Sequence, residues 1–344
     1  MATKRPTSLP SDILSEICCR YGLQVPDLSV VKGGLANLMY EYWKDDKFYM
    51  LRVSSEKPRD QILAELDWIR YLRDNGVSAS KPVPSNQDKL VETVSYRDRL
   101  LHCVSFEKAA GQSVLLESAG FNPVLWNDTL WRGMGRLMGR MHSLTKDYSV
   151  EGKGFRRKTF DDDPFIQIRD FVSKPLVIEK FNDLLDDIRS LSRSRDGYGL
   201  VHGDFIVWNF FVHRDQIILF DFDDARYDWF INDIAVTFHN TLINAPKPAV
   251  ISFAERFIRA FWQGYKEENT LNVDWIRLLP AFLQFQTIYH YTVFNRMIRD
   301  DLLDEEDKKF FRGIISSLEK MIVNNIPFVE FTVKRWCQLY SQHY

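Results

Sequence analysis

The first third of the chain alternates between short apolar runs and polar turns, a pattern typical of antiparallel strands. The predicted strands are Leu28–Lys32, Met39–Trp43, Lys47–Val53, Lys89–Ser95 and Arg99–Phe106. One segment in this region, Pro58 to Leu72, instead repeats its apolar residues at helical spacing and ends before Asn75-Gly76. The pattern therefore predicts a small lobe of strands with one helix.

After Gly111 the apolar residues follow long helical repeats. The predicted elements are, in order, a helix at Asn122–Leu144, the polar loop Glu151–Asp163, a helix at Pro164–Ser194, and helices from about Phe230 to the end. Together with the first region, this pattern predicts an α+β fold. Its β-rich lobe would span residues 1–107, and its larger, mainly helical lobe would span residues 108–344.

Composition narrows the classes of function. The 344 residues are 45% hydrophobic, enough for a sizeable core, and the formal net charge is -2. Without a bulk positive charge, we expect no nucleic acid and no membrane as partner, and a small ligand is the first expectation. The segment Met1–Pro10 is not followed by the apolar stretch of a secretion signal, and the chain has no apolar run of about 18 residues, so we expect a soluble protein that is not exported. The four cysteines lack metal or disulfide spacing, so a cytoplasmic protein is expected.

The candidate catalytic residues lie in a segment with the sequence pattern of strands, Leu200–Asp223, between the helical regions. Two predicted strands, Asn209–Val212 and Gln216–Phe222, flank the turn 213–215. Phosphoryl transfer needs a carboxylate that orients the acceptor hydroxyl, a carbonyl oxygen for a magnesium ion, and a second carboxylate on that ion. Asp204, Asn209 and Asp221 supply these groups, and a separation of about five residues lets one catalytic loop aim its Asp and Asn into one cleft.

The alternative is a hairpin whose acidic residues merely face solvent. Strand alternation argues against it, because Asp221 and Asp223 would share one face with an apolar strand behind them. Two carboxylates placed so close repel each other, and a divalent cation is their natural partner. Asp223 is interpreted either as a second metal contact or as a brace for the loop.

The motif His202-Gly203-Asp204 with Asn209 resembles the loop of the aminoglycoside phosphotransferase and choline kinase family, over about residues 25 to 300. The resemblance implies a bilobal protein-kinase-like fold that uses Mg2+ and ATP or GTP. It implies Asp204 as catalytic base, Asn209 and Asp221 as magnesium ligands, and His202 as support of the loop. The run Asp221–Ala225 is similar to the branch of type II homoserine kinases, spore-coat kinase-like proteins, antibiotic kinases and a stress-response Ser/Thr kinase. That branch usually has His-x-Gly where this chain has Ile206-Val207-Trp208.

The first lobe offers parts for a nucleotide. The glycine pair Gly33-Gly34, followed by Asn37, allows backbone N–H groups to approach phosphates, although such a pair is also an ordinary turn. Arg52 stands where the resemblance implies a phosphate-binding lysine. Glu65 lies on the apolar stripe of its helix, so it is expected to pair with Arg52 unless it flanks the stripe and reaches solvent. Backbone groups of the inter-lobe hinge would contact the base, at Phe106, Glu107 and Lys108.

The acceptor is the least defined part. Tyr289, His290 and Phe294 are either core residues or part of an acceptor pocket, which relatives build from C-terminal helices, and Asp233 is expected to be structural. An acidic run favours an amine-bearing acceptor, as in antibiotic kinases, and comprises Asp221, Asp223, Asp224 and Asp228. The hypothesis is a magnesium-dependent kinase acting on a hydroxyl of a small molecule, favouring an antibiotic inactivated by phosphorylation. The alternatives are a homoserine- or choline-like metabolic kinase, a protein Ser/Thr kinase, and a non-catalytic coat protein.

Overall fold

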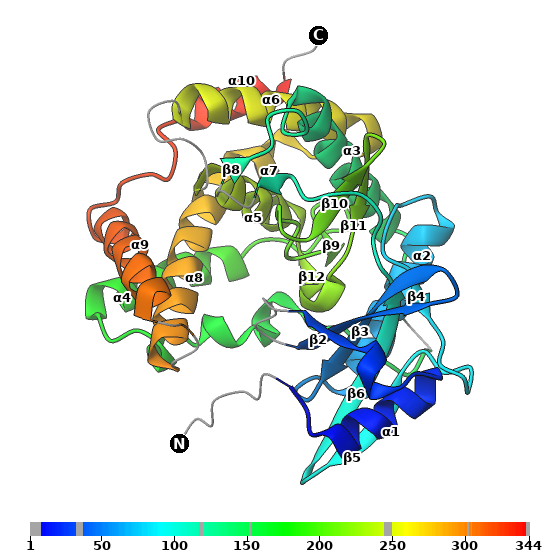
Figure 1. Ribbon diagram of the computed structural model, residues 1–344. Coiled ribbons are helices and arrows are strands. Elements are labelled where there is room, and N and C mark those ends of the chain that lie inside the picture. The colour runs from blue at the N-terminus through cyan, green and yellow to red at the C-terminus, as the bar shows by residue number, and fades with distance from the viewer. Residues whose placement is uncertain are drawn as a thin grey trace.

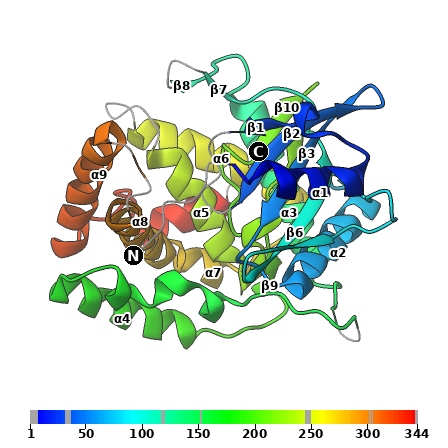
Figure 2. The same cartoon turned by 60° about the horizontal axis from the view of Figure 1, so that its bottom comes forward.

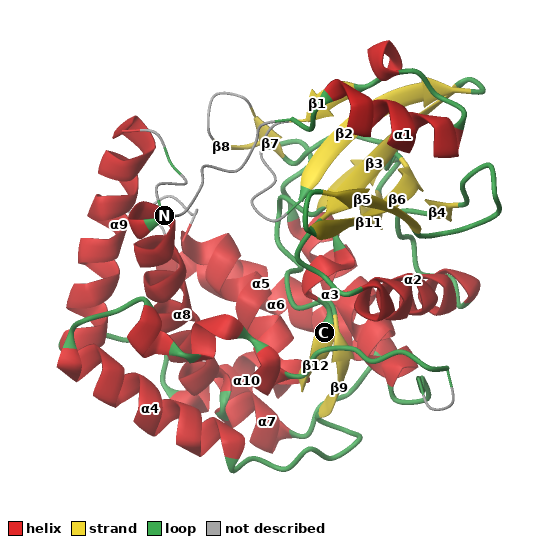
Figure 3. Cartoon of the chain, turned by 90° about the horizontal axis from the view of Figure 1, so that it is seen from below, coloured by secondary structure: helices red, strands yellow, loops and turns green. Residues whose placement is uncertain are grey.

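The computed structural model describes residues 8–31, 37–116, 120–150, 153–243, 250–300, 303 and 305–341 (Figure 1). Gly33 and Gly34 lie outside these residues. In Figure 3 the strands of the first lobe gather at one end of the molecule, and most of the helices form the other end. β6 ends at Glu107, the residue at which the first lobe is predicted to end. Within the described residues, none of the helices combines the length and the hydropathy needed to cross a bilayer.

An antiparallel sheet forms the first lobe, in the order β1-β2-β3-β6-β4, with β5 paired to β6. Its strands are β1 (Ser29–Val31), β2 (Leu38–Lys44), β3 (Lys47–Ser54), β4 (Pro82–Val83), β5 (Glu92–Tyr96) and β6 (Arg99–Glu107). Each predicted strand is present, with ends shifted by up to three residues. The register places Arg52 of β3 opposite Met39 of β2 and Val104 of β6.

Two helices cover the two faces of this sheet (Figure 2). α1 (Ser11–Tyr21), which is absent from the elements predicted above, packs on the face that carries Leu51 and Val53. The predicted helix is α2 (Arg59–Asp74), which joins the opposite face and the large core of the second lobe. Side chains alternate along a strand, so Arg52 lies on the α2 face. The first lobe thus contains one helix more than expected.

The second lobe is mainly helical, as predicted. Its helices are α3 (Asp128–Thr145), α4 (Pro175–Arg189), α5 (Phe230–Ile243), α6 (Val250–Glu268), α7 (Val273–Arg277), α8 (Leu279–Arg299), α9 (Glu305–Val323) and α10 (Val333–Ser341). The helix expected from Pro164 begins only at Pro175. Lys174 is extended, as the residue before proline prefers, and short 3-10 turns fill residues 160–170.

The candidate catalytic residues lie next to two short pairs of antiparallel strands. β9 (Tyr198–Val201) pairs with β12 (Arg226–Trp229), and β10 (Phe210–His213) pairs with β11 (Gln216–Leu219). A further pair, β7 (Leu115–Leu116) and β8 (Gly120–Phe121), lies apart from them. The strand expected to reach Phe222 ends at Leu219. Asp221 has a φ of 62°, and a 3-10 turn follows it, so strand alternation does not extend to Asp223 and the argument that both carboxylates share a strand face is wrong.

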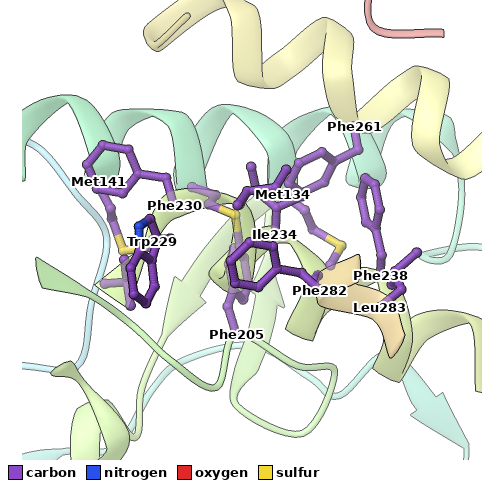
Figure 4. Close-up of a cluster of buried hydrophobic side chains, with 14 of the residues drawn as sticks. Met134, Met141, Phe205, Trp229, Phe230, Ile234, Phe238, Phe261, Phe282 and Leu283 are labelled. Atoms are coloured by element: carbon purple, nitrogen blue, oxygen red, sulfur yellow. The ribbon is translucent and has the colours of Figure 1, made fainter. Parts of the chain in front are cut away.

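The core of the second lobe anchors this region. Figure 4 shows Phe205 lying in a cluster with Phe230, Ile234 and Phe282, in contact with methionines of α3. α3 and α6 approach closely enough that a Cβ atom built on Gly135 would lie 1.9 Å from the carbonyl oxygen of Phe261. Glycine is therefore required at this helix crossing.

Gly135→Ala is expected to lower the free energy of unfolding by at least about 2 kcal/mol, because α3 and α6 would have to separate. The control is Gly133→Ala in the same helix, where the new methyl would meet only the end of Ile217 at 3.5 Å. That variant should be neutral or gain up to about 1 kcal/mol from helix propensity. Urea denaturation followed by circular dichroism measures both, and equal effects would contradict the close crossing.

Candidate active site

The loop from His202 to Asn209 connects β9 to β10 and is held rigidly. Phe205 is fully buried, and its carbonyl oxygen accepts a hydrogen bond from Thr237 Oγ1 at 2.7 Å. The backbone N–H of Asn209 donates to the carbonyl oxygen of Ile206 at 3.0 Å, which closes a turn. The apolar residues at 205 and 207 therefore point inward as anchors, while Asp204 remains only partly buried.

Asp204 and Asn209 lie side by side, as their spacing predicts. The Nδ2 group of Asn209 donates to Oδ2 of Asp204 at 2.7 Å and to its carbonyl oxygen at 2.9 Å. The amide oxygen of Asn209 consequently faces away from Asp204. Burial away from water raises the pKa of Asp204 above its usual value, and the nearby carboxylates of Asp224 and Asp221 raise it further. This carboxylate is half-buried and ready to accept a proton from a neighbouring hydroxyl.

Asp221 follows directly after the strand pair that adjoins Asn209. The N–H of Phe220 donates to the carbonyl oxygen of Asn209 at 2.9 Å. Asp221 is the next residue, so this hydrogen bond holds its backbone close to Asn209. Partial removal of the carboxylate from water and the negative charge of the neighbouring Asp223 raise the pKa of Asp221 to about 7, although the side chain still reaches solvent. Two carboxylates that resist ionisation beside an outward amide oxygen form a donor set that suits a divalent cation.

The described residues contain no group of three or more His, Cys, Asp and Glu side chains arranged to hold a metal ion. Asp221 and Asn209 would hold a magnesium ion, which would offset negative charge on bound phosphates.

A buried network supports the loop from behind. Nδ1 of His202 accepts the N–H of Asp204 at 3.2 Å, so Nε2 carries the proton and faces the carbonyl oxygen of Phe220 at 3.3 Å. Burial lowers the pKa of His202 and keeps it neutral. The N–H of Gly203 donates to Asp233 at 2.8 Å, and Asp233 also contacts His142 at 3.0 Å. The structural roles expected for His202 and Asp233 are confirmed by these contacts.

Arg52 is the centre of a second, ionic network. Its Nη1 and Nη2 atoms donate to the two carboxylate oxygens of Glu65 at 2.8 and 2.9 Å, so the expected pair is present and bidentate. Nη1 also lies 3.1 Å from Asp223. The guanidinium stands 5.3 Å from the centre of the Phe106 ring. Arg52 and Glu65 are both buried, so the pair links β3 to α2 away from bulk water.

Asp223 is occupied by protein groups. Oδ1 contacts Arg52 and lies 2.7 Å from Lys57 Nζ, and Oδ2 accepts from Asn37 at 3.0 Å. Although burial opposes ionisation, Arg52 and Lys57 hold the pKa of Asp223 well below its usual value. These contacts match the brace interpretation, in which Asp223 ties the turn to the first lobe.

Sequence reasoning missed two cations around this turn, Lys57 and Arg157. Arg157 is buried and donates only to backbone carbonyl oxygens: Ala225 at 2.7 Å, Phe222 at 3.0 Å, Gln61 at 3.0 Å and Asp223 at 3.3 Å. It therefore fastens the turn 222–225 to the start of α2. Arg157 lies in a polar loop, and a lone arginine in such a loop carries no sequence signal for this role.

The predicted hinge positions are largely engaged within the protein. The N–H of Glu107 donates to Lys81 at 2.8 Å, and the N–H of Lys108 donates to Phe48 at 2.9 Å. The Lys108 ammonium pairs with Glu41. Phe106 contributes its ring, stacked under Arg52, to the cleft face of the sheet. The backbone donors at 107 and 108 thus already have partners.

The acidic run divides into different environments. Asp228 is buried, accepts from Arg226 at 2.9 Å and Asn232 at 2.8 Å, and burial raises its pKa to about 6. Asp224, by contrast, is exposed beside the catalytic loop. On α8, Tyr289 donates to Asp163 at 3.0 Å, and the ring of His290 contacts that of Phe294. These three α8 residues are partly buried rather than fully enclosed.

Comparisons with known proteins identify the family to which the chain belongs. A model of the phosphotransferase enzyme family (APH) matches residues 27–271. The chain is 32% identical over 331 residues to amicoumacin kinase of Bacillus subtilis (strain 168), covering 93% of this chain and 94% of that protein.

Solved structures give the same result. Amicoumacin kinase hAmiN, in complex with AMP-PNP, Ca2+ and Ami, superposes with a TM-score of 0.86 at 28% identity, over 95% of this chain and 97% of that one. The microcompartment-associated aminopropanol kinase, at 18% identity, has a TM-score of 0.69 over 92% and 98% of the two chains. The spectinomycin phosphotransferase APH(9)-Ia, at 14% identity, has a TM-score of 0.59 over 95% and 96%. The kinase-like fold implied by the sequence is thereby confirmed.

Glu65→Gln is expected to lower the free energy of unfolding by about 3 kcal/mol, because the buried guanidinium of Arg52 would keep Asp223 as its only anionic partner at hydrogen-bonding distance. Glu267→Gln is the matched control, since Glu267 pairs with Arg132 and Arg136 at the surface, at 2.6 Å each. It should change stability by less than about 1 kcal/mol. Chemical denaturation of both variants provides the measurement, and equal losses would show that burial of the pair does not matter.

Proposed function

Because the chain belongs to the phosphotransferase enzyme family, we propose that it is a magnesium-dependent kinase that transfers the γ-phosphoryl group of ATP, or of GTP, to a hydroxyl of an amine-bearing antibiotic. That it is a small-molecule phosphotransferase follows from the family and from its similarity to amicoumacin kinase. The nucleotide, the metal and the acceptor class are the proposed parts. The proposed location is the cytoplasm, and the four cysteines are unpaired.

The observation that carries this proposal is the convergence of Asp204, Asn209 and Asp221 at one end of two short strand pairs. Asp204 orients the acceptor hydroxyl and takes its proton as the new O–P bond forms. Asn209 and Asp221 hold the magnesium ion, which offsets negative charge on the phosphates. Asp223 keeps this turn tied to the first lobe through Arg52 and Lys57.

The nucleotide lies, in this proposal, between the sheet of the first lobe and the catalytic loop. Arg52 is already charged and oriented by Glu65, so its guanidinium offers a fixed cation near the phosphates. Gly33 and Gly34, which lie outside the described residues, and Asn37 are proposed from the sequence alone as further phosphate contacts. Phe106, Glu107 and Lys108 border the base, with the ring of Phe106 as the apolar contact.

Two observations support an amine-bearing acceptor. The exposed carboxylate of Asp224, next to the catalytic loop, adds negative potential to the outer side of that loop, which favours a cationic substrate. The similar kinase of known structure carries AMP-PNP, Ca2+ and Ami together, which supports a nucleotide, a divalent ion and an antibiotic acceptor here. A homoserine- or choline-like metabolic kinase is the second candidate, because the aminopropanol kinase shares the fold.

The first test is a reaction of the protein with ATP or GTP, magnesium and a mixed panel of antibiotics and polar metabolites, analysed by mass spectrometry. We expect one amine-bearing compound to gain a single phosphoryl group. Asp204→Ala should slow this transfer by about 100-fold to 10000-fold, because the proton acceptor is lost. Its nucleotide affinity should stay within about twofold. Transfer at the wild-type rate would disprove the assignment of Asp204.

Asp221→Ala is expected to abolish the magnesium-dependent part of ATP binding, measured by isothermal titration calorimetry with and without magnesium. Asp196→Ala, at the opposite end of β9, is the control and should bind as the wild type does. In the wild type, magnesium affinity should fall as the pH drops below about 7, because protons then compete for Asp221. An unchanged titration in Asp221→Ala would rule out its metal role.

A further inference from the structure

One large aromatic side chain of the catalytic loop is not buried. Trp208 is 62% exposed, although it directly precedes Asn209 and follows Asp204 by four positions. Its neighbours Val207 and Asn209 are buried. Within the part of the chain that the structure describes, no other aromatic ring and no cation is stacked on the indole. The loop therefore presents an unused π face at the rim of the site.

The position of this indole is fixed by the loop beneath it. Trp208 is the third residue of the turn that the hydrogen bond from Asn209 to Ile206 closes. Asn209 is tied to Asp204, and Phe205 is anchored in the core and by Thr237. Because the backbone on both sides is held, Trp208 stays beside the carboxylate that orients the acceptor hydroxyl. A rigid, exposed aromatic residue next to a reacting group is a typical recognition element.

The charges around Trp208 indicate what it recognises. Of the acidic run, Asp223 is neutralised by Arg52 and Lys57, and Asp228 by Arg226. Asp224 remains exposed, and the N-terminal side of the loop lies against it, since a Cβ atom on Gly203 would come within 2.6 Å of the Asp224 carbonyl oxygen. An exposed aromatic face on a loop that packs against the turn carrying Asp224 favours an ammonium group, because the ring attracts the cation directly and the acidic turn adds a negative potential.

We propose that Trp208 is a specificity residue that binds the ammonium group of the acceptor over its indole face while Asp204 orients the hydroxyl. This inference rests on the proposed kinase function and specifies its substrate class: alcohols with a protonated amine a few bonds from the reacting oxygen. Neutral alcohols of the same size would bind the same site more weakly. The small residue that is usual at this position in the resembling branch offers no such face.

The test uses amicoumacin as the first acceptor probe, together with the amine-bearing compounds phosphorylated in the panel and their N-acetylated derivatives. Trp208→Leu keeps an apolar side chain but removes the π face, and Trp208→Phe keeps a π face. We expect Trp208→Leu to raise the acceptor KM about 10-fold and Trp208→Phe to raise it less than about 3-fold. The KM for ATP should stay within about twofold in both variants. Phe310→Leu, which removes an exposed aromatic ring on α9, is the control and should change neither constant.

A double-mutant comparison isolates the ammonium contact. N-acetylation of the acceptor should raise the acceptor KM about 10-fold for the wild type but less than about 3-fold for Trp208→Leu, because this variant lacks the indole ring that would contact the ammonium group. Equal effects of acetylation on both proteins would overturn the proposal, as would an equal rise of the ATP KM in Trp208→Leu, which would indicate a distorted turn. If the wild type phosphorylates none of these amines, the proposed amine-bearing acceptor class itself fails. Transfer with unchanged acceptor KM in the variants refutes only the role of Trp208.

Discussion

The charge of Arg52, held inside the protein, is the constraint around which the site is built. A buried guanidinium is tolerated only with anionic partners close by, and this one takes Glu65 from α2 and Asp223 from the turn after β11. The three residues come from segments separated by up to 171 positions, which this one cation brings to hydrogen-bonding distance. The orientation of this turn relative to the sheet therefore depends on an interaction that is electrostatic rather than apolar.

Arg157 complements this arrangement from the other side of the turn. Arg52 binds carboxylates, whereas Arg157 binds only carbonyl oxygens of the turn and of α2. Burial lowers the pKa of Arg157, while nearby carboxylates act in the opposite direction. Arg52 therefore holds the turn through the side chain of Asp223, and Arg157 holds it through backbone carbonyl oxygens. This leaves little conformational freedom for the neighbouring Asp221.

The parts of the site that the sequence predicts are those encoded by short spacings. Asp204, Asn209 and Asp221 lie within 18 positions of one another, and Glu65 stands on a helical stripe facing the strand of Arg52. The rest depends on long-range packing, which spacing does not contain. Nothing in the sequence around Arg157 or Lys57 distinguishes them from solvent-exposed cations, and their contacts with the turn form only in the folded chain. The positive φ at Asp221 ends the strand pattern earlier than alternation suggests, and α1 lies before the first predicted strand.

α2 packs closely against the turn that carries Asp221 and against the second lobe. Trp68 of α2 meets Phe222 of this turn with ring centres 5.5 Å apart, and Tyr71 donates to the carbonyl oxygen of Leu144 in α3 at 3.2 Å. Swinging this helix outward would expose a buried indole and cost several kcal/mol, about 2 or more for the tryptophan alone. Because of these contacts, α2 cannot swing away from the second lobe without also uncovering the turn that carries Asp221 and Asp223.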